Sequence, residues 1–134
     1  MTTDTYHGSC LCGQIHYTVS HITATSHCHC SMCRKAHGAA FASYASVLKD
    51  DHVFTSGAAL VKTWRSSPQV TRCFCSACGS PLLWHSEGEF AAWVSFPLAA
   101  LDTPYLPPRQ KHIHVTSRVP WFPIADEWPQ TEAS

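Results

Sequence analysis

Short runs of alternating apolar and polar residues recur along most of the chain. In the segment 14–19, Ile15, Tyr17 and Val19 alternate with polar neighbours, and this period of two predicts a strand with one buried face. Comparable short runs predict further strands at 39–47, 52–55, 60–65, 70–74, 81–85, 90–96 and 111–116. The pattern therefore predicts a chain of many short strands.

Turn-forming residues separate these runs at 50–51, 66–68 and 104–108. The one helical signal is a single turn over 34–37, which Ser31 can cap and Gly38 can end. Residues 1–7 are expected to be a frayed lead-in. With nine prolines and so little helix, the chain is predicted to be an all-β domain.

Composition sets the size of the molecule and disfavours two kinds of partner. At 134 residues, 45% of them hydrophobic, the chain is long enough for one domain with a modest core, and we expect a single domain over 1–134. Nine basic residues balance nine acidic ones, so the basic field of a nucleic-acid-binding protein is missing. No apolar run approaches membrane-spanning length.

Eight cysteines are the unusual feature of the composition. They fall into tight C-x-C and C-x-x-C groups, which are typical of metal ligation, whereas disulfides that staple distant loops need separated cysteines. Residues 1–7 contain no apolar segment that could act as a secretion signal. We therefore expect zinc binding in the reducing cytoplasm, in preference to a disulfide framework or thiol redox chemistry.

Four of the cysteines can complete one structural zinc site. Cys75-Ser-Ala-Cys78-Gly79 falls at a predicted strand-to-strand turn, where such a sequence forms a zinc knuckle that supplies two ligands. Cys10 and Cys12, near the tip of a predicted hairpin, are the natural other two. A closed four-thiolate site of this kind would contribute folding energy directly.

A second candidate site is formed by the closely spaced Cys28, Cys30 and Cys33. Cys73 is left over, either as a buried inert thiol or as the fourth ligand here, which would make this site structural too. If three thiolates hold the zinc, the metal is a poor Lewis acid towards water and is better suited to binding a substrate thiol. The thiol's pKa falls while its sulfur stays nucleophilic enough to attack a carbon electrophile.

The three cysteine groups and their neighbours resemble the glutathione-dependent formaldehyde-activating enzyme family, which also includes centromere protein V. The likeness extends from about Tyr6 to about Trp128. The residues that carry it are Gly8-Ser-Cys-Leu-Cys-Gly13, Cys28-His-Cys-Ser-Met-Cys-Arg-Lys35 with Gly38-Ala39, and Arg72-Cys-Phe-Cys-Ser-Ala-Cys-Gly-Ser80, followed by the weaker positions Gly57, Trp64-Arg-Ser-Ser67, His112-Ile113 and Pro120-Trp121-Phe122.

This resemblance implies a fold of packed antiparallel sheets with two zinc ions, in a domain whose core spans about 6–128. It assigns the structural zinc to Cys10, Cys12, Cys75 and Cys78. It assigns the second zinc to Cys28, Cys30 and Cys33, with a fourth position for the glutathione sulfur. The family's reaction joins glutathione to formaldehyde to give S-(hydroxymethyl)glutathione, formally a carbon–sulfur lyase reaction run in reverse. With three ligands, the second zinc is expected to be the more easily lost in purification.

Several side chains are candidates for holding the substrate or moving a proton. The cations that could pair with carboxylates are Arg34, Lys35, Lys62, Arg65, Arg72 and Arg118. For any one of them a solvated surface charge is the more common case. Arg34 is the exception, because it directly follows the proposed ligand Cys33, and Lys35 comes next in the chain. Trp121, in a Pro-Trp-Phe-Pro loop, is the candidate pocket wall. His29 and His37 are candidates for proton transfer, although addition of a thiolate to a reactive aldehyde needs little acid catalysis.

Two classes of function fit these observations. The leading hypothesis is a zinc enzyme that adds a glutathione-like thiol to a small aldehyde, or that applies the same mechanism to a different thiol or electrophile. The alternative is a zinc-stabilised module that binds a protein partner without catalysis. A second site closed by Cys73 would favour the module, whereas a site of three cysteines would favour the enzyme.

Overall fold

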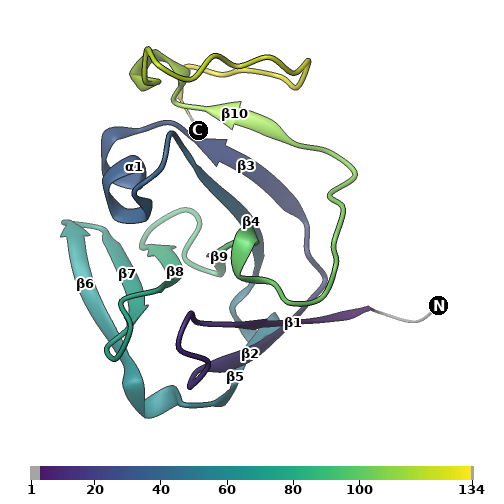
Figure 1. The fold of residues 1–134 in the computed structure, drawn as a ribbon, viewed down its shortest axis with the longest axis vertical. Helices are drawn as coiled ribbons and strands as arrows, with labels where there is room; N and C mark the ends of the chain where they lie inside the picture. The colour runs from purple at the N-terminus through teal and green to yellow at the C-terminus, as the bar shows by residue number, and fades with distance from the viewer. Residues whose placement is uncertain (1–3, 134) are drawn as a thin grey trace.

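The computed structural model describes residues 4–133 as two β-sheets with one short helix (Figure 1). The helix α1 spans Ser31–His37. The strands are β1 (Thr5–Ser9), β2 (His16–Ser20), β3 (Ala24–Cys28), β4 (Ala42–Leu48), β5 (His52–Ser56), β6 (Val61–Ser67), β7 (Val70–Cys75), β8 (Pro81–Ser86), β9 (Trp93–Pro97) and β10 (Lys111–Ile113). Single 3-10 turns lie at Lys49–Asp51, Ala58–Leu60, Leu98–Ala100 and Val115–Ser117.

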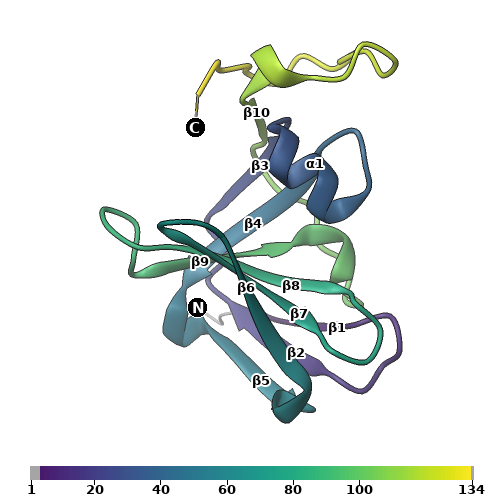
Figure 2. The same cartoon turned by 90° about the vertical axis from the view of Figure 1, so that its left-hand side faces the viewer.

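The strands form one small and one large sheet. The small sheet has the order β1-β2-β5, and the large sheet has the order β10-β3-β4-β9-β8-β7-β6. All neighbours are antiparallel except β10, which pairs in parallel with β3. In Figure 2 the small sheet lies beneath the β7 and β8 end of the large one. The predicted all-β class with packed sheets is confirmed, and the parallel β10 makes the large sheet mixed.

The main core lies between the two sheets. Ile15, Tyr17 and Val19 from β2 and the segment before it pack there with Leu82 of β8 and Phe96 of β9, and all five are buried. Because successive side chains of a strand point to opposite faces, the alternation in 14–19 directs its apolar residues into this core. The buried face predicted for that segment is therefore confirmed.

Several expectations for individual elements were wrong. The strand predicted at 39–47 starts only at Ala42, and the strand predicted at 111–116 ends at Ile113, because Val115–Ser117 forms a 3-10 turn. The lead-in predicted at 1–7 becomes strand β1 from Thr5, paired with β2, and residues 1–3 lie outside the described residues. The helix begins at Ser31 with Cys30 as its cap, because the Cys30 Sγ accepts a hydrogen bond from the Cys33 amide. The strand predicted at 90–96 starts only at Trp93, because residues 90–92 form an exposed turn.

One strand gave no signal in the sequence. The residues of β3, Ala24–Cys28, are mostly polar, yet β3 pairs with β4 on one side and with β10 on the other. Its end delivers Cys28 to the start of α1, so this strand positions the second cysteine group.

The C-terminal segment after β10 packs back along that strand. The His112 amide donates to the Pro129 carbonyl at 2.8 Å, and the Thr131 amide donates to the His112 carbonyl at 2.9 Å. Figure 1 shows this segment at the top of the molecule, beside β10 and above α1. Within residues 4–133 the structure contains no helix long and apolar enough to span a membrane.

Candidate metal centres and cavity

The first cysteine cluster joins the two sheets. Cys10 and Cys12 lie in the turn between β1 and β2, Cys75 ends β7, and Cys78 lies in the turn that leads to β8. The four Sγ atoms lie within 4.8 Å of one another. The Cys10 to Cys12 distance is 3.5 Å and the Cys12 to Cys75 distance is 3.9 Å.

This geometry fits a tetrahedral zinc site. Zinc–sulfur bonds of about 2.3 Å place the sulfurs of a tetrahedron about 3.8 Å apart, close to the spacing observed. Protein donors also point at the sulfurs, since the Ile15 amide donates to Cys10 Sγ at 3.4 Å. Hydrogen bonds from the Ser80 hydroxyl and amide lower the pKa of Cys78 to about 5, which favours the thiolate that a metal requires.

The second cluster wraps around the junction of β3 and α1. Cys28 ends β3, Cys30 caps α1 and Cys33 lies in its first turn, and their Sγ atoms lie within 4.8 Å of one another. Cys28 and Cys33 are 5% and 4% exposed, and Cys30 is half-buried. Three soft sulfur ligands in this arrangement suit zinc. Among residues 4–133, no fourth Cys, His, Asp or Glu ligand atom joins the cluster.

Arg72 and Tyr44 reach one sulfur of this cluster from the large sheet. Arg72, on β7, donates through Nη2 to Cys33 Sγ at 3.6 Å and through Nη1 to Tyr44 Oη at 3.1 Å. Tyr44, on β4, lies 3.9 Å from Cys33 Sγ and 2.9 Å from His37 Nε2. Hydrogen bonding to Cys28, followed by the Arg72 guanidinium, lowers the pKa of Cys33.

A cavity of about 200 Å³ opens beside the second cluster. Its walls include all three cysteines and the apolar side chains Met32, Trp84 and Ile113, together with Tyr44 and Arg72. A neighbouring cavity of about 250 Å³ shares Tyr44 and Arg72 and contains Cys73, His37 and Trp64. The Arg72–Tyr44 pair therefore lies at the boundary between the two cavities.

Cys73 belongs to neither cluster among the described residues. It is half-buried on β7, packs against the main core, and burial raises the pKa of its thiol. A raised thiol pKa disfavours both metal ligation and nucleophilic reactivity. The geometry matches the buried thiol weighed from the sequence and not the fourth ligand.

His29 does not line the cavity. Its ring is 1% exposed, packs against Phe41, and lies 2.8 Å through Nε2 from Nδ1 of His112. His112 Nε2 in turn lies 2.9 Å from a carboxylate oxygen of Asp126 in the C-terminal segment. Burial lowers the pKa of His29 to about 4, so the ring is neutral. The chain from Asp126 through His112 to His29 connects the C-terminal segment to the loop that carries the cysteines.

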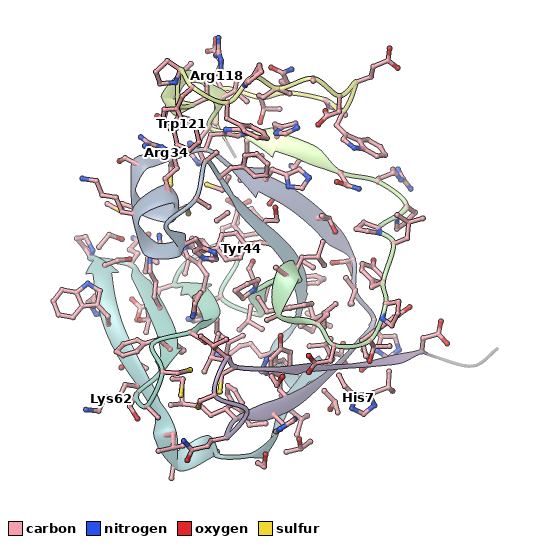
Figure 3. The ribbon with its side chains drawn as sticks, viewed as in Figure 1. His7, Arg34, Tyr44, Lys62, Arg118 and Trp121 are labelled. Carbon is pink, nitrogen blue, oxygen red and sulfur yellow. The ribbon has the colours of Figure 1, made fainter. Side chains whose placement is uncertain are left out.

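The residues predicted to bind substrate line neither cavity. Arg34 is half-buried and donates through Nε to the carbonyl of His29 at 3.2 Å, whereas Lys35 is exposed. Trp121 is 67% exposed in the C-terminal segment. In Figure 3, Arg34 and Trp121 are both seen in the upper part of the view, while Tyr44 is seen near its centre. Their roles as substrate contacts stay predictions.

Sequence reasoning brought the cysteines together but missed Tyr44. Arg72 had been weighed only as one of six cations for a carboxylate. Tyr44 and Arg72 are 28 positions apart, and Arg72 and Cys33 are 39 apart. No local pattern marks such a pair, because the sheet order β4-β9-β8-β7 is what brings them together.

Comparison with known proteins gives a family and a fold. The family model described as "Glutathione-dependent formaldehyde-activating enzyme" matches residues 5–117. A crystal structure of a Rhodobacter sphaeroides protein superposes with a TM-score of 0.62 at 21% sequence identity, covering 76% of this chain and 91% of that one. At this identity the superposition supports the fold alone. No curated protein matches the chain in sequence.

Proposed function

The chain belongs to the glutathione-dependent formaldehyde-activating enzyme family, and on that premise we propose that it is a zinc-dependent carbon–sulfur lyase. In the direction of addition it joins a glutathione-like thiol to a small aldehyde, and with formaldehyde the product is S-(hydroxymethyl)glutathione. The observation that carries this proposal is the cluster of Cys28, Cys30 and Cys33 in the wall of a cavity. A closed structural site would need no such opening.

The two clusters take different roles in this proposal. Cys10, Cys12, Cys75 and Cys78 hold a structural zinc between the sheets. Cys28, Cys30 and Cys33 hold the second zinc, which when bound keeps a substrate thiol in its nucleophilic thiolate form. The apolar walls Trp84 and Ile113 exclude water from the thiol and the aldehyde.

The addition needs one proton at the aldehyde oxygen. The substrate sulfur forms a bond to the carbonyl carbon, and the electron pair of the C=O π bond moves to oxygen. That oxygen takes a proton equivalent to the one that the thiol gave up. Tyr44 Oη lines the cavity and burial raises its pKa, so the hydroxyl stays protonated and can donate there. Burial lowers the pKa of His37, so its ring is neutral; it lies 2.9 Å from Oη and can relay a proton to it by giving up the Nε2 proton while Nδ1 accepts one.

The rest of a glutathione-like thiol carries two carboxylates. We assign them to Arg34 and Lys35, because both follow Cys33 on α1 and a charged partner recognises a carboxylate well. Trp121 is assigned as an outer wall of the same face. These assignments are part of the proposal.

A non-catalytic binding module is the competing function. A second cluster closed by Cys73 would favour that reading, and Cys73 lies outside the cluster. The same mechanism acting on another thiol or electrophile shares every residue role given above, so a panel of thiols and aldehydes distinguishes it.

The proposal is tested by NMR exchange spectroscopy on glutathione and formaldehyde. We expect the zinc-loaded protein to accelerate the exchange over buffer, and Cys28→Ser to return the rate to that of buffer. Cys73→Ser is the matched control, because it removes a half-buried thiol from outside the clusters, and it should keep the full rate. Absence of any acceleration with both clusters loaded would contradict the formaldehyde activity.

A further inference from the structure

The three sulfurs of the second cluster have different surroundings. Cys30 Sγ accepts a hydrogen bond from the Cys33 amide at 3.3 Å. Cys33 Sγ faces the guanidinium of Arg72 at 3.6 Å and the hydroxyl of Tyr44 at 3.9 Å. Among the side chains of residues 4–133, Arg72 is the one cation that donates a hydrogen bond to a sulfur of this cluster. The cluster is therefore asymmetric in charge.

Arg72 is held firmly enough to keep this contact. Its Nε donates to Ser66 Oγ at 3.0 Å, its Nη1 to Tyr44 Oη and its Nη2 to Cys33 Sγ. Three partners on three different elements fix the plane of the guanidinium. The side chain is half-buried between the two cavities, so water competes weakly for its donors.

An electrophile in the cavity meets ligand sulfurs as well as the substrate sulfur. If an aldehyde reacted at Cys33, its carbon would bond to Sγ, its oxygen would take a proton from water, and the alkylated sulfur would be a poor metal ligand. A charge-assisted hydrogen bond withdraws electron density from a thiolate and lowers its nucleophilicity. A group that makes such a bond to a ligand sulfur, and not to the incoming thiol, directs the reaction to the substrate.

We infer that Arg72 is a positioning residue that keeps Cys33 a ligand and restricts reaction with electrophiles to the substrate thiol, with Tyr44 holding the guanidinium in place. This inference rests on the proposed function, since it explains how a thiolate-rich site handles an aldehyde without losing its own ligands. From the sequence, Arg72 was a candidate partner for a carboxylate of the substrate, and the inference reassigns it as a partner of Cys33.

The chain contains its own control for this role. Cys28 and Cys33 are almost equally buried, at 5% and 4% exposed, but Arg72 reaches only Cys33. In the zinc-loaded protein, iodoacetamide alkylates a sulfur by forming an S–C bond with loss of iodide. Tandem mass spectrometry of the peptide that spans both cysteines locates the modified sulfur. We expect Cys33 to react roughly tenfold more slowly than Cys28, a difference on the scale of one charged hydrogen bond.

Substitution of Arg72 should abolish this difference. In Arg72→Gln the Cys33 to Cys28 rate ratio should come to within about twofold of one. Arg65→Gln is the matched control: Arg65 lies exposed on the adjacent edge strand and pairs with Glu87 at the surface, and the ratio should stay at the wild-type value. Loosening of the fold or loss of zinc would also bring the ratio towards one, but by speeding both cysteines. Loss of the Arg72 contact alone should speed Cys33 and leave the Cys28 rate and the zinc content unchanged, so these two readings separate positioning from stability.

Equal rates at Cys28 and Cys33 in the wild type would overturn the inference without any variant. An unchanged ratio in a folded Arg72→Gln protein would overturn it as well. The measurement uses neither glutathione nor aldehyde, so it is independent of the addition assay. A protein without addition activity that still shows the Arg72-dependent ratio would refute the proposed function alone.

Discussion

The Tyr44 hydroxyl contacts three functional groups around the second cluster. Its Oη lies against His37 Nε2, Arg72 Nη1 and Cys33 Sγ. One oxygen thus connects α1, the large sheet and the Cys33 sulfur, and we expect its removal to change the rate of the proposed reaction more than the stability of the fold.

Tyr44→Phe should slow the addition of glutathione to formaldehyde by roughly 10- to 100-fold, the lower range for loss of a positioned acid. The ring still fills the same space, so the metal content should not change. Tyr105→Phe is the matched control, because Tyr105 packs against Tyr6 away from both cavities. NMR exchange and metal analysis on the same samples measure the two quantities. An unchanged rate in Tyr44→Phe would remove the hydroxyl from the mechanism.

The buried His52 in the small sheet should make the stability of the fold depend on pH. Its ring is 9% exposed and stacks on Tyr17 with centroids 4.6 Å apart. Burial lowers the pKa of His52 from 6.5 to about 4. As the pH falls, this ring therefore takes up a proton at a higher pH in the unfolded chain than in the folded one. The folded state loses stability as the pH falls from 6.5 towards 4.

Between pH 7 and pH 5 this ring should remove roughly 2 kcal/mol from the free energy of unfolding. His52→Phe should lack that part of the acid sensitivity, because phenylalanine cannot take up the proton. His7→Phe, at an exposed position of the same sheet, should keep it. Urea unfolding at the two pH values gives the comparison, and loss of metal at low pH cancels between the variants. A His52→Phe protein with the wild-type pH dependence would contradict the assignment.

At the scale of elements, the junction between β5 and the turn that follows depends on Gly57. Its φ of +73° lies in the left-handed region. A Cβ built there would also collide with the backbone carbonyl of Gln14. The Gln14 carbonyl belongs to the backbone and not to a flexible side chain, so the overlap could be relieved only by moving the backbone.

Gly57→Ala should lower the free energy of unfolding by about 3 kcal/mol or more, because steric overlap adds to backbone strain. Gly88→Ala is the control for strain alone. Its φ is also positive, at +96°, but nothing lies within 4 Å of the added Cβ, so the loss should be roughly 1–2 kcal/mol. Denaturant titration measures both. Equal losses of unfolding free energy in the two variants would mean that the contact between the added Cβ and the Gln14 carbonyl does not destabilise the fold.

The elements also show how far the sequence could predict the molecule. Local spacing identifies each group of nearby cysteines, because short spacings keep their sulfurs close together. The joining of Cys10 and Cys12 to Cys75 and Cys78 was inferred by counting ligands, since a knuckle supplies two of the four that a structural zinc needs, and the structure brings the four together. The alternation around Tyr17 predicted its strand because it too is a local pattern. Strand β3 has no such signal, since its stability comes from pairing on both sides. Arg72 reaches Cys33 only through the order of the large sheet, which no local pattern encodes.

At the scale of the whole molecule, the two clusters differ in how much chain they connect. The first cluster joins residues 63 positions apart and ties the small sheet to the large one. The second lies within a single junction of strand and helix. A cross-link that closes a long loop removes more conformational entropy from the unfolded chain than one that closes a short loop. Metal at the first cluster should therefore stabilise the fold far more than metal at the second.

Cys78→Ser and Cys30→Ser test this difference as a matched pair. Each removes one half-buried thiol from one cluster, and serine at position 30 can still cap α1. Each variant should lose about one zinc per chain. Cys78→Ser should lower the thermal unfolding midpoint by roughly 10 °C or more, whereas Cys30→Ser should lower it by only about 2–4 °C. Calorimetry with metal analysis on the same samples decides between the roles. A larger fall of the unfolding midpoint in Cys30→Ser than in Cys78→Ser would make the second cluster the structural one, and the roles proposed for the two sites would be exchanged.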